Sequence, residues 1–344
     1  MRVSRRRRLQ YRAALAWAVV AATVCAAPLT VSSTATAAPG SAAAALTPHS
    51  RVLPGTACRV FPASSIFHKD ISKAPVSKHS KVWLAHMHTA GTKLHPDFGP
   101  SYGAQPVPYG IPVTTVKATH AKVKVHFTYA SESDRITYPL GSDTKIEGGK
   151  GATGDRHAIV VNAKTCRLYE TYDTHHTSHG WTAGSGASWN LNSNALRPAG
   201  WTSADAAGLP ILVGLLRYDE VKAGSIDHPI RFTTDITSDR YVWPARHEAG
   251  STKSGNYPPM GAWFRLKASY STKGYSKQAR VILTAMKHHG LILADNGSPW
   301  YFQGTSDSRW PDGLIAQLKR IPASAFQAID VSKLKVSKNS AKAR

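Results

Sequence analysis

Histidine, arginine and carboxylate side chains fall at the ends of β-prone runs, where they could act as acids, bases or charge stabilisers. Residues 227–235 and 240–247 flank a polar turn and predict an antiparallel hairpin. Centring the turn between its two strands places His228 opposite His247, beside Arg246, at the end of an apolar ladder. We therefore expect this hairpin to carry part of a functional site.

A second predicted hairpin also begins with a histidine. Residues 158–161 and 166–172 are β-prone and flank a polar turn, and symmetric pairing sets His157 opposite Glu170. If both hairpins are neighbours in one sheet, their polar ends form a single site with His228 and His247. The alternative is that these histidines are hydrogen-bonded residues at the rim of a sheet.

Carboxylates are scarce, with 20 Asp and Glu in 344 residues, yet residues 131–149 hold four of them. Loops that carry such clusters are often functional, although a solvated loop that balances neighbouring Lys and Arg is the alternative. Glycoside hydrolysis requires two carboxylates that flank one bond. No spacing rule selects the pair among the candidates, which are Glu132, Asp134, Glu147, Glu170 and Asp295.

A polysaccharide lyase would instead need a general base in a cationic cleft. The sequence offers His228, His247, Arg246 and Lys267 for that chemistry. Amide and aromatic side chains suit sugar recognition, because amides bond hydroxyl groups and rings stack on pyranose faces. The expected substrate-binding residues are Trp181, Asn190, Asn192, Asn194, Trp243 and Lys267. An exposed strand over an aromatic core explains the Asn and Trp residues equally well.

The N-terminus predicts export. A run of four arginines precedes an uncharged apolar stretch, and small residues follow up to Ala35-Thr36-Ala37, a cleavage signal. The apolar stretch is too short to span a membrane comfortably. We expect a signal peptide at 1–37, by the Sec or the Tat route, and a secreted protein that is extracellular or associated with the cell wall.

The formal net charge of +23 includes six arginines of the predicted signal, so the exported chain keeps about +17. Such a surface favours a polysaccharide or an anionic cell-wall polymer as partner, or else serves only solubility and retention at the wall. We expect no specific nucleic acid, no membrane anchor after cleavage, a monomer, and no cofactor. A divalent metal at a His/Glu cluster is the alternative to the last expectation.

Two cysteines, Cys58 and Cys166, remain after removal of the signal. In an exported chain such a pair predicts a disulfide, and the spacing does not fit a zinc site. Their sulfurs are therefore expected to be structural.

Hairpins and loops rich in Gly and Pro dominate the chain. A third hairpin is expected over residues 291–302, with Asn296-Gly297 at its turn. Helices are expected at 78–89, 204–207, 277–289 and 314–319. We predict a mainly β fold, an antiparallel β-sandwich or jelly-roll-like core with two or three peripheral helices. The expected organisation is a leader at 38–57, one β-rich domain at 58–332 and a basic tail at 333–344.

The segments 203–212, 217–221, 226–228 and 242–247 resemble a set of secreted bacterial proteins, largely actinobacterial. The likeness extends over most of residues 58–330. It implies a secreted single domain and no particular activity or catalytic residue.

The sequence is compatible with three functions. The first is an enzyme that acts on an extracellular or cell-wall polysaccharide, as a glycoside hydrolase or a lyase. The second is a non-catalytic carbohydrate- or wall-binding protein. The third is a metal-dependent nuclease, because Asp155-Arg156-His157 resembles the Asp-Arg-Gly-His signature of secreted nucleases, although the Gly is missing.

Overall fold

The computed structural model describes residues 52–102, 107, 109–149 and 151–344. The chain divides into two units, 1–44 and 45–344, and every described residue belongs to the second. The predicted signal peptide and most of the predicted leader therefore lie outside the described residues. Within the described residues, no helix is long and apolar enough to cross a membrane.

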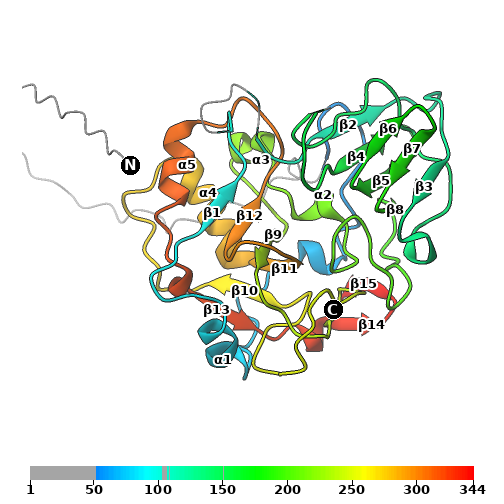
Figure 1. Cartoon of the computed structure of the whole chain (residues 1–344). Helices are drawn as coiled ribbons and strands as arrows, with labels where there is room; N and C mark the ends of the chain where they lie inside the picture. The colour runs from blue at the N-terminus through cyan, green and yellow to red at the C-terminus, as the bar shows by residue number, and fades with distance from the viewer. Residues whose placement is uncertain (1–51, 103–106, 108, 150) are drawn as a thin grey trace, which may run out of the picture. The chain divides into compact units, whose positions relative to one another are not determined.

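The largest sheet has six strands in the order β1-β12-β9-β11-β10-β13 (Figure 1). Its strands are β1 His95–Asp97, β9 Ile230–Thr234, β10 Trp263–Leu266, β11 Leu291–Asn296, β12 Tyr301–Gln303 and β13 Phe326–Ile329. Strand β9 lies at the centre, parallel to β11 on one side and antiparallel to β12 on the other. All five of its residues are buried, so it is covered on both faces.

Three smaller sheets accompany it. A four-stranded sheet has the order β2-β4-β5-β8 and a three-stranded sheet the order β3-β7-β6, while β14 and β15 form a hairpin. Their strands are β2 Val113–Val116, β3 Val125–Phe127, β4 Ala158–Asn162, β5 Arg167–Tyr172, β6 His175–Thr177, β7 Gly180–Ala183, β8 Ser185–Asn190, β14 Lys335–Ser337 and β15 Ser340–Ala343.

The described α-helices are α1 Ser80–Ala85, α2 Ile211–Gly214, α3 Tyr218–Ala223, α4 Lys277–His288 and α5 Asp312–Leu318. Helix α4 is the longest and packs on β10, and α5 packs on α4 and on β1 (Figure 1). The Ser276 side chain accepts a hydrogen bond from the Ala279 amide and so begins α4 where the sequence predicts.

Alternation along the strands divides the core into two clusters. In β4, Ile159 and Val161 face a large cluster that includes Phe232 of the six-stranded sheet. Val160, between them, faces a smaller cluster around Tyr138, between the four-stranded and three-stranded sheets. The four-stranded sheet is therefore buried on both sides.

The mainly β class is confirmed, but a jelly-roll sandwich is not. Four of the strand pairs are parallel, namely β1–β12, β9–β11, β2–β4 and β3–β7. Parallel pairs require crossover connections, whereas the antiparallel sandwich that the sequence predicts needs only hairpins and Greek-key turns.

One of the three predicted hairpins is confirmed. Strands β4 and β5 are antiparallel, but Glu170 pairs with Ile159, so His157 lies two residues away from the expected register. The ring of His157 instead lies beside the Tyr172 ring, with 5.8 Å between centroids.

The other two hairpins are wrong for one reason, which is the central position of β9. Strands β11 and β12 do not pair with each other, because β9 lies between them. Residues 240–247 form no strand and carry only an isolated bridge between Tyr241 and Met260. Pro244 cannot donate a ladder hydrogen bond, so this segment is poorly suited to pair with a fully buried strand.

Helices at 277–289 and 314–319 are confirmed as α4 and α5, and that at 78–89 is confirmed in part as the shorter α1. Residues 204–207 form turns rather than a helix. The residues expected to form a basic tail are mostly built into the β14–β15 hairpin, in which Ala341 is buried.

The disulfide between Cys58 and Cys166 is confirmed. It joins the first described segment to the turn between β4 and β5, across 108 positions of sequence.

Candidate active site

The best candidate is a pocket of about 370 Å³, here called the Asp295 pocket. It is lined by Tyr129, Glu132, Tyr172, Ser185, Thr202, Ser203, Ala204, Ala206, His247 and Asp295. These residues come from the ends of β5 and β11, the start of β8, the 3-10 helix Ala130–Glu132 with the residue before it, and two loops. Two carboxyl groups, an imidazole and two phenol rings thus face one space.

Asp295 enters the pocket from strand β11, where it pairs with Thr233 of β9. Its side chain is 28% exposed. Burial raises the pKa of Asp295 above its ordinary value of 3.8, and the Arg231 cation opposes that rise. A carboxyl group with a raised pKa is suited to donate a proton.

Glu132 and His247 lie side by side in the same pocket. Their nearest atoms, Glu132 Oε2 and His247 Nε2, are 3.6 Å apart, and their side chains are 34% and 25% exposed. The Thr202 amide donates a hydrogen bond of 3.1 Å to Glu132 Oε2. The Nδ1 atom of His247 is 2.8 Å from the Ala206 carbonyl oxygen, which fixes the ring and leaves Nε2 toward Glu132.

The charges behind the Asp295 pocket form a buried network around Arg231. Its Nε donates to Asp205 Oδ2 at 3.1 Å, and its Nη2 lies 3.7 Å from Asp295 Oδ2. Burial raises the pKa of Asp205 to about 7 in spite of this cation. Such concentrations of buried ionisable groups are typical of functional sites, although structural networks also produce them.

His157 supports the pocket wall from behind. Its Nδ1 lies 2.6 Å from the Glu147 carboxylate, and its Nε2 lies 3.2 Å from the carbonyl oxygen of Ala204. Burial by itself lowers the pKa of His157, but the attraction of Glu147 outweighs it and the pKa is raised. Because both ring nitrogens are engaged, His157 holds the Ala204 segment in place rather than facing the pocket.

Glu170 is fully buried and serves the start of α2. Its two carboxylate oxygens accept hydrogen bonds from the Ile211 and Leu212 amides, each at 2.8 Å. Burial raises its pKa to about 7. It does not line the Asp295 pocket.

Asp134 and Arg246 lie next to the pocket without lining it. Asp134 accepts a hydrogen bond from Arg197 Nη1 at 2.6 Å and another from the Ser188 amide at 2.8 Å. Arg246 lines a neighbouring cavity together with Arg197. Both residues therefore shape the surroundings of the pocket.

His228 is separated from the other candidates. It precedes β9 and lies 3.0 Å from Glu220 Oε2, buried beside α3. His247, by contrast, lies near the other end of β9 and β11. The backbone N–H of its neighbour Arg246 donates to the Ala207 carbonyl oxygen, and the Ala207 N–H donates to the carbonyl oxygen of Ala294. The expected pairing of His228 with His247 is wrong because residues 240–247 do not form the partner strand of β9.

The predicted substrate-binding residues do not form one surface. Trp181 is 8% exposed and lines a different cavity with Arg156 and His176. The amide of Asn194 bonds to Ser64, and Asn190 bonds to the Asn192 backbone. Trp243 lines the cavity of Arg246, and Lys267 is exposed and bonds to the Ser324 carbonyl oxygen.

Several residues of the site are absent from the sequence-based candidates. They are Tyr129, Tyr172, Ser203, Asp205 and Arg231. Asp205 and Arg231 interrupt apolar runs, and a charge within a run that must be buried is a signal that could have identified both. The hydroxyl of Ser203 donates to the Leu209 carbonyl oxygen and that of Ser185 to the Ser203 carbonyl oxygen, so neither is paired with a histidine as a nucleophile would be.

Among the described residues, no group of three or more His, Cys, Asp or Glu side chains is arranged to hold a metal ion. Comparisons with family models, curated proteins and solved structures found no match to this chain.

Proposed function

We propose that this protein is a glycoside hydrolase that acts on an extracellular or cell-wall polysaccharide in the Asp295 pocket. The observation that carries the proposal is the presence of Glu132 and Asp295, two carboxyl groups in different environments, in one pocket. Glycosidases use such a pair, one protonated as acid and the other ionised as base or nucleophile.

In the proposed reaction, Asp295 gives its proton to the glycosidic oxygen while the bond from that oxygen to the anomeric carbon breaks. Glu132 takes a proton from a water molecule, whose oxygen bonds to the anomeric carbon. Asp295 is left as a carboxylate and Glu132 as an acid, and proton exchange with solvent restores both. His247 lies beside Glu132, with 3.6 Å between their nearest atoms.

The two tyrosines suit a sugar substrate. Tyr129 is 55% exposed at the mouth of the pocket, and Tyr172 lines its wall. Aromatic rings offer flat apolar surface on which the apolar face of a pyranose can pack. The same rings would serve a carbohydrate-binding protein without catalysis, which is the alternative function.

The test is a panel of neutral and acidic polysaccharides with the wild type, Asp295→Asn and Glu132→Gln. We expect the wild type to release reducing ends, and each variant to lose about a hundredfold or more of the rate. Asp312→Asn, an exposed carboxylate outside the pocket, is the matched control and should keep full activity.

Three results would contradict the proposal. An unsaturated uronide product would indicate a lyase, and retention without cleavage would indicate a binding protein. Cleavage that survives both pocket substitutions would move the active site elsewhere.

A further inference from the structure

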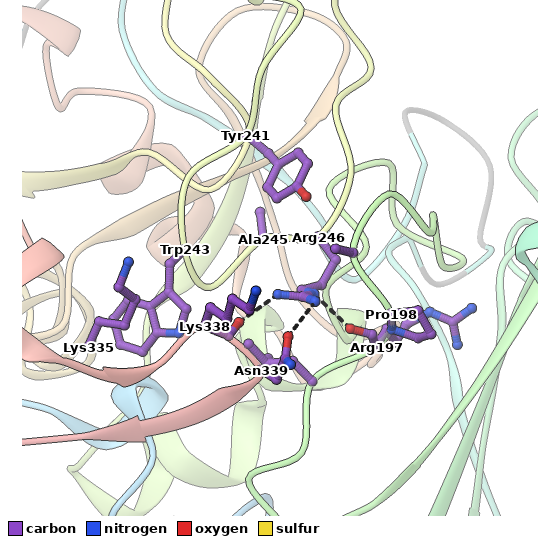
Figure 2. A pocket seen from close by; sticks show the side chains of 11 residues that line it. Arg197, Pro198, Tyr241, Trp243, Ala245, Arg246, Lys335, Lys338 and Asn339 are labelled. Carbon is purple, nitrogen blue, oxygen red and sulfur yellow. Dashed lines mark hydrogen bonds between the residues drawn. The ribbon is translucent and has the colours of Figure 1, made fainter.

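Two adjoining cavities form what we call the basic groove. They have volumes of about 700 Å³ and 630 Å³ and share Tyr241, Trp243 and Lys335. The first cavity is drawn in Figure 2, where Arg246 and Lys338 lie across it from Tyr241. The residues expected to be a basic tail therefore form one wall of a groove.

Most of the positive charge in the first cavity lacks an internal partner, and the exception is Arg197, which pairs with Asp134. Arg246 is 5% exposed and donates to three neutral acceptors, the carbonyl oxygens of Arg197 and Lys338 and the amide oxygen of Asn339 (Figure 2). Lys335 and Lys338 are exposed on the β14–β15 hairpin. Within the described part of the chain, none of these three cations forms an ion pair. Burying a cation without a carboxylate is unfavourable, and an anionic ligand would compensate it.

The carboxylate that lines the groove lies in the second cavity. Of the described residues that line the two cavities, Asp330 is the one with a carboxylate, and it lines the second cavity alone. The Ser332 amide donates to it at 2.9 Å. Among the described residues no carboxylate lines the first cavity, so its net charge is positive, whereas the charge of the second cavity is more nearly balanced.

Aromatic rings accompany the charges. Trp243 and Tyr241 are half-buried, and the Trp243 indole N–H donates to the Ser340 carbonyl oxygen at 2.9 Å, which fixes the ring. In the second cavity, the rings of His79 and Trp83 are stacked with 5.2 Å between centroids. Flat rings beside cations fit a chain of sugar rings that carries carboxylates.

The basic groove adjoins the Asp295 pocket. Arg246 lines the groove, and the next residue, His247, lines the pocket. Arg197 also lines the groove, and its Nε donates at 2.9 Å to the carbonyl oxygen of Thr202, a pocket residue. Arg197 and Arg246 therefore connect the wall of the groove to the wall of the pocket.

We propose that the basic groove binds a segment of an acidic polysaccharide, with carboxylates on its sugars, and presents the chain to the Asp295 pocket. The choice of a sugar chain rests on the proposed function. A nucleic acid would also fit cations and aromatic rings. However, its phosphodiester is already charged and would be repelled by the ionised Glu132, whereas a glycosidic bond is neutral.

The experiment measures binding of the full chain in an Asp295→Asn background, so that the polymer is not consumed. The probes are sodium polygalacturonate, the same polymer with methyl-esterified carboxylates, and a single-stranded DNA oligonucleotide. Lys335→Glu/Lys338→Glu is compared with Lys273→Glu/Lys277→Glu, an equal charge change at two exposed lysines that do not line the groove.

We expect the groove variant to lose about tenfold or more in affinity for polygalacturonate, the control less than about twofold, and added salt to weaken the wild type. Equal losses in both variants, or unchanged binding in the groove variant, would overturn the inference. So would DNA binding tighter than polygalacturonate binding and dependent on the same lysines. If the protein with Asp295 intact cleaves no polysaccharide but still binds through the groove lysines, the proposed function is refuted and the groove assignment stands.

Discussion

Arg231 Nη2 lies 3.7 Å from Asp295 Oδ2, so the carboxyl group that faces the pocket is in contact with a buried cation. Burial favours the neutral acid and Arg231 favours the carboxylate, and the net result is a raised pKa. The protonation of Asp295 is therefore set by a balance between two large opposing effects.

The pH dependence of the rate should reveal this balance. If Asp295 is the acid, the active form is protonated, and activity falls as the pH rises through its pKa. Because that pKa is raised, the alkaline limb of kcat/KM should lie above pH 3.8, the ordinary value for Asp. A limb at or below that pH in a pH–rate profile would show that Asp295 is not the acid.

The buried pair of Asp205 and Arg231 should dominate stability in this region. Asp205→Asn leaves the Arg231 cation inside the protein without its nearest partner, which should cost about 3–5 kcal/mol in the free energy of unfolding. Urea denaturation measures this directly. Arg309→Ala, which breaks ion pairs of Asp219 and Asp307 at the surface, is the comparison and should cost about 1 kcal/mol or less. Similar losses in the two variants would be evidence against the network.

The pair of Glu147 and His157 should make stability depend on pH in a defined window. The pKa of His157 is raised, so its contribution is complete below pH 6.5 and is lost as the pH rises through the folded value. The pKa of Glu147 is lowered by His157 although burial opposes this, so its contribution is present above pH 4.5 and is lost on acidification. The stability difference between wild type and Glu147→Gln, from urea titrations, should therefore shrink on both sides of that window.

A difference that stays constant from pH 4 to pH 9 would contradict this account. Asp143→Asn provides the control, because Asp143 pairs with His120 at the surface and its side chain is 57% exposed.

The disulfide should contribute strongly to stability, because it closes a loop of 108 positions. By the chain-entropy model, the Cys58→Ser/Cys166→Ser variant should lose about 4–5 kcal/mol in the free energy of unfolding. Wild type treated with a thiol reductant should denature at the same urea concentration as this variant. If the oxidised wild type and the variant unfold at the same urea concentration, the disulfide contributes nothing to the free energy of unfolding.

Local signals in the sequence predict local structure well in this chain. Ser276 and the apolar periodicity after it give α4, and the polar turn after β4 gives the β4–β5 pair. Strand β9 lies between β11 and β12, which come later in the chain. No property of residues 227–247 predicts these two partners. The register of His157 was likewise decided by the turn geometry rather than by symmetry.

The candidate site likewise combines residues that the sequence indicates with an arrangement that it does not. Glu132, His247 and Asp295 were among the sequence candidates, but nothing in their spacing joined them. They meet because Thr202, Ala206 and the end of β11 fix three distant segments around one pocket. Arg231 lies within a β-prone run and is not a sequence candidate, because its role depends on Asp205 and Asp295, which are distant in sequence.

The Asp295 pocket draws its walls from residue 129 to residue 295. No proteolytic fragment or shortened clone that lacks either end of that span can hold the whole pocket. The rate of hydrolysis would thus serve as an assay for correct folding, because partly folded or proteolysed molecules would be inactive. A screen for stabilised variants could use it to count native molecules directly.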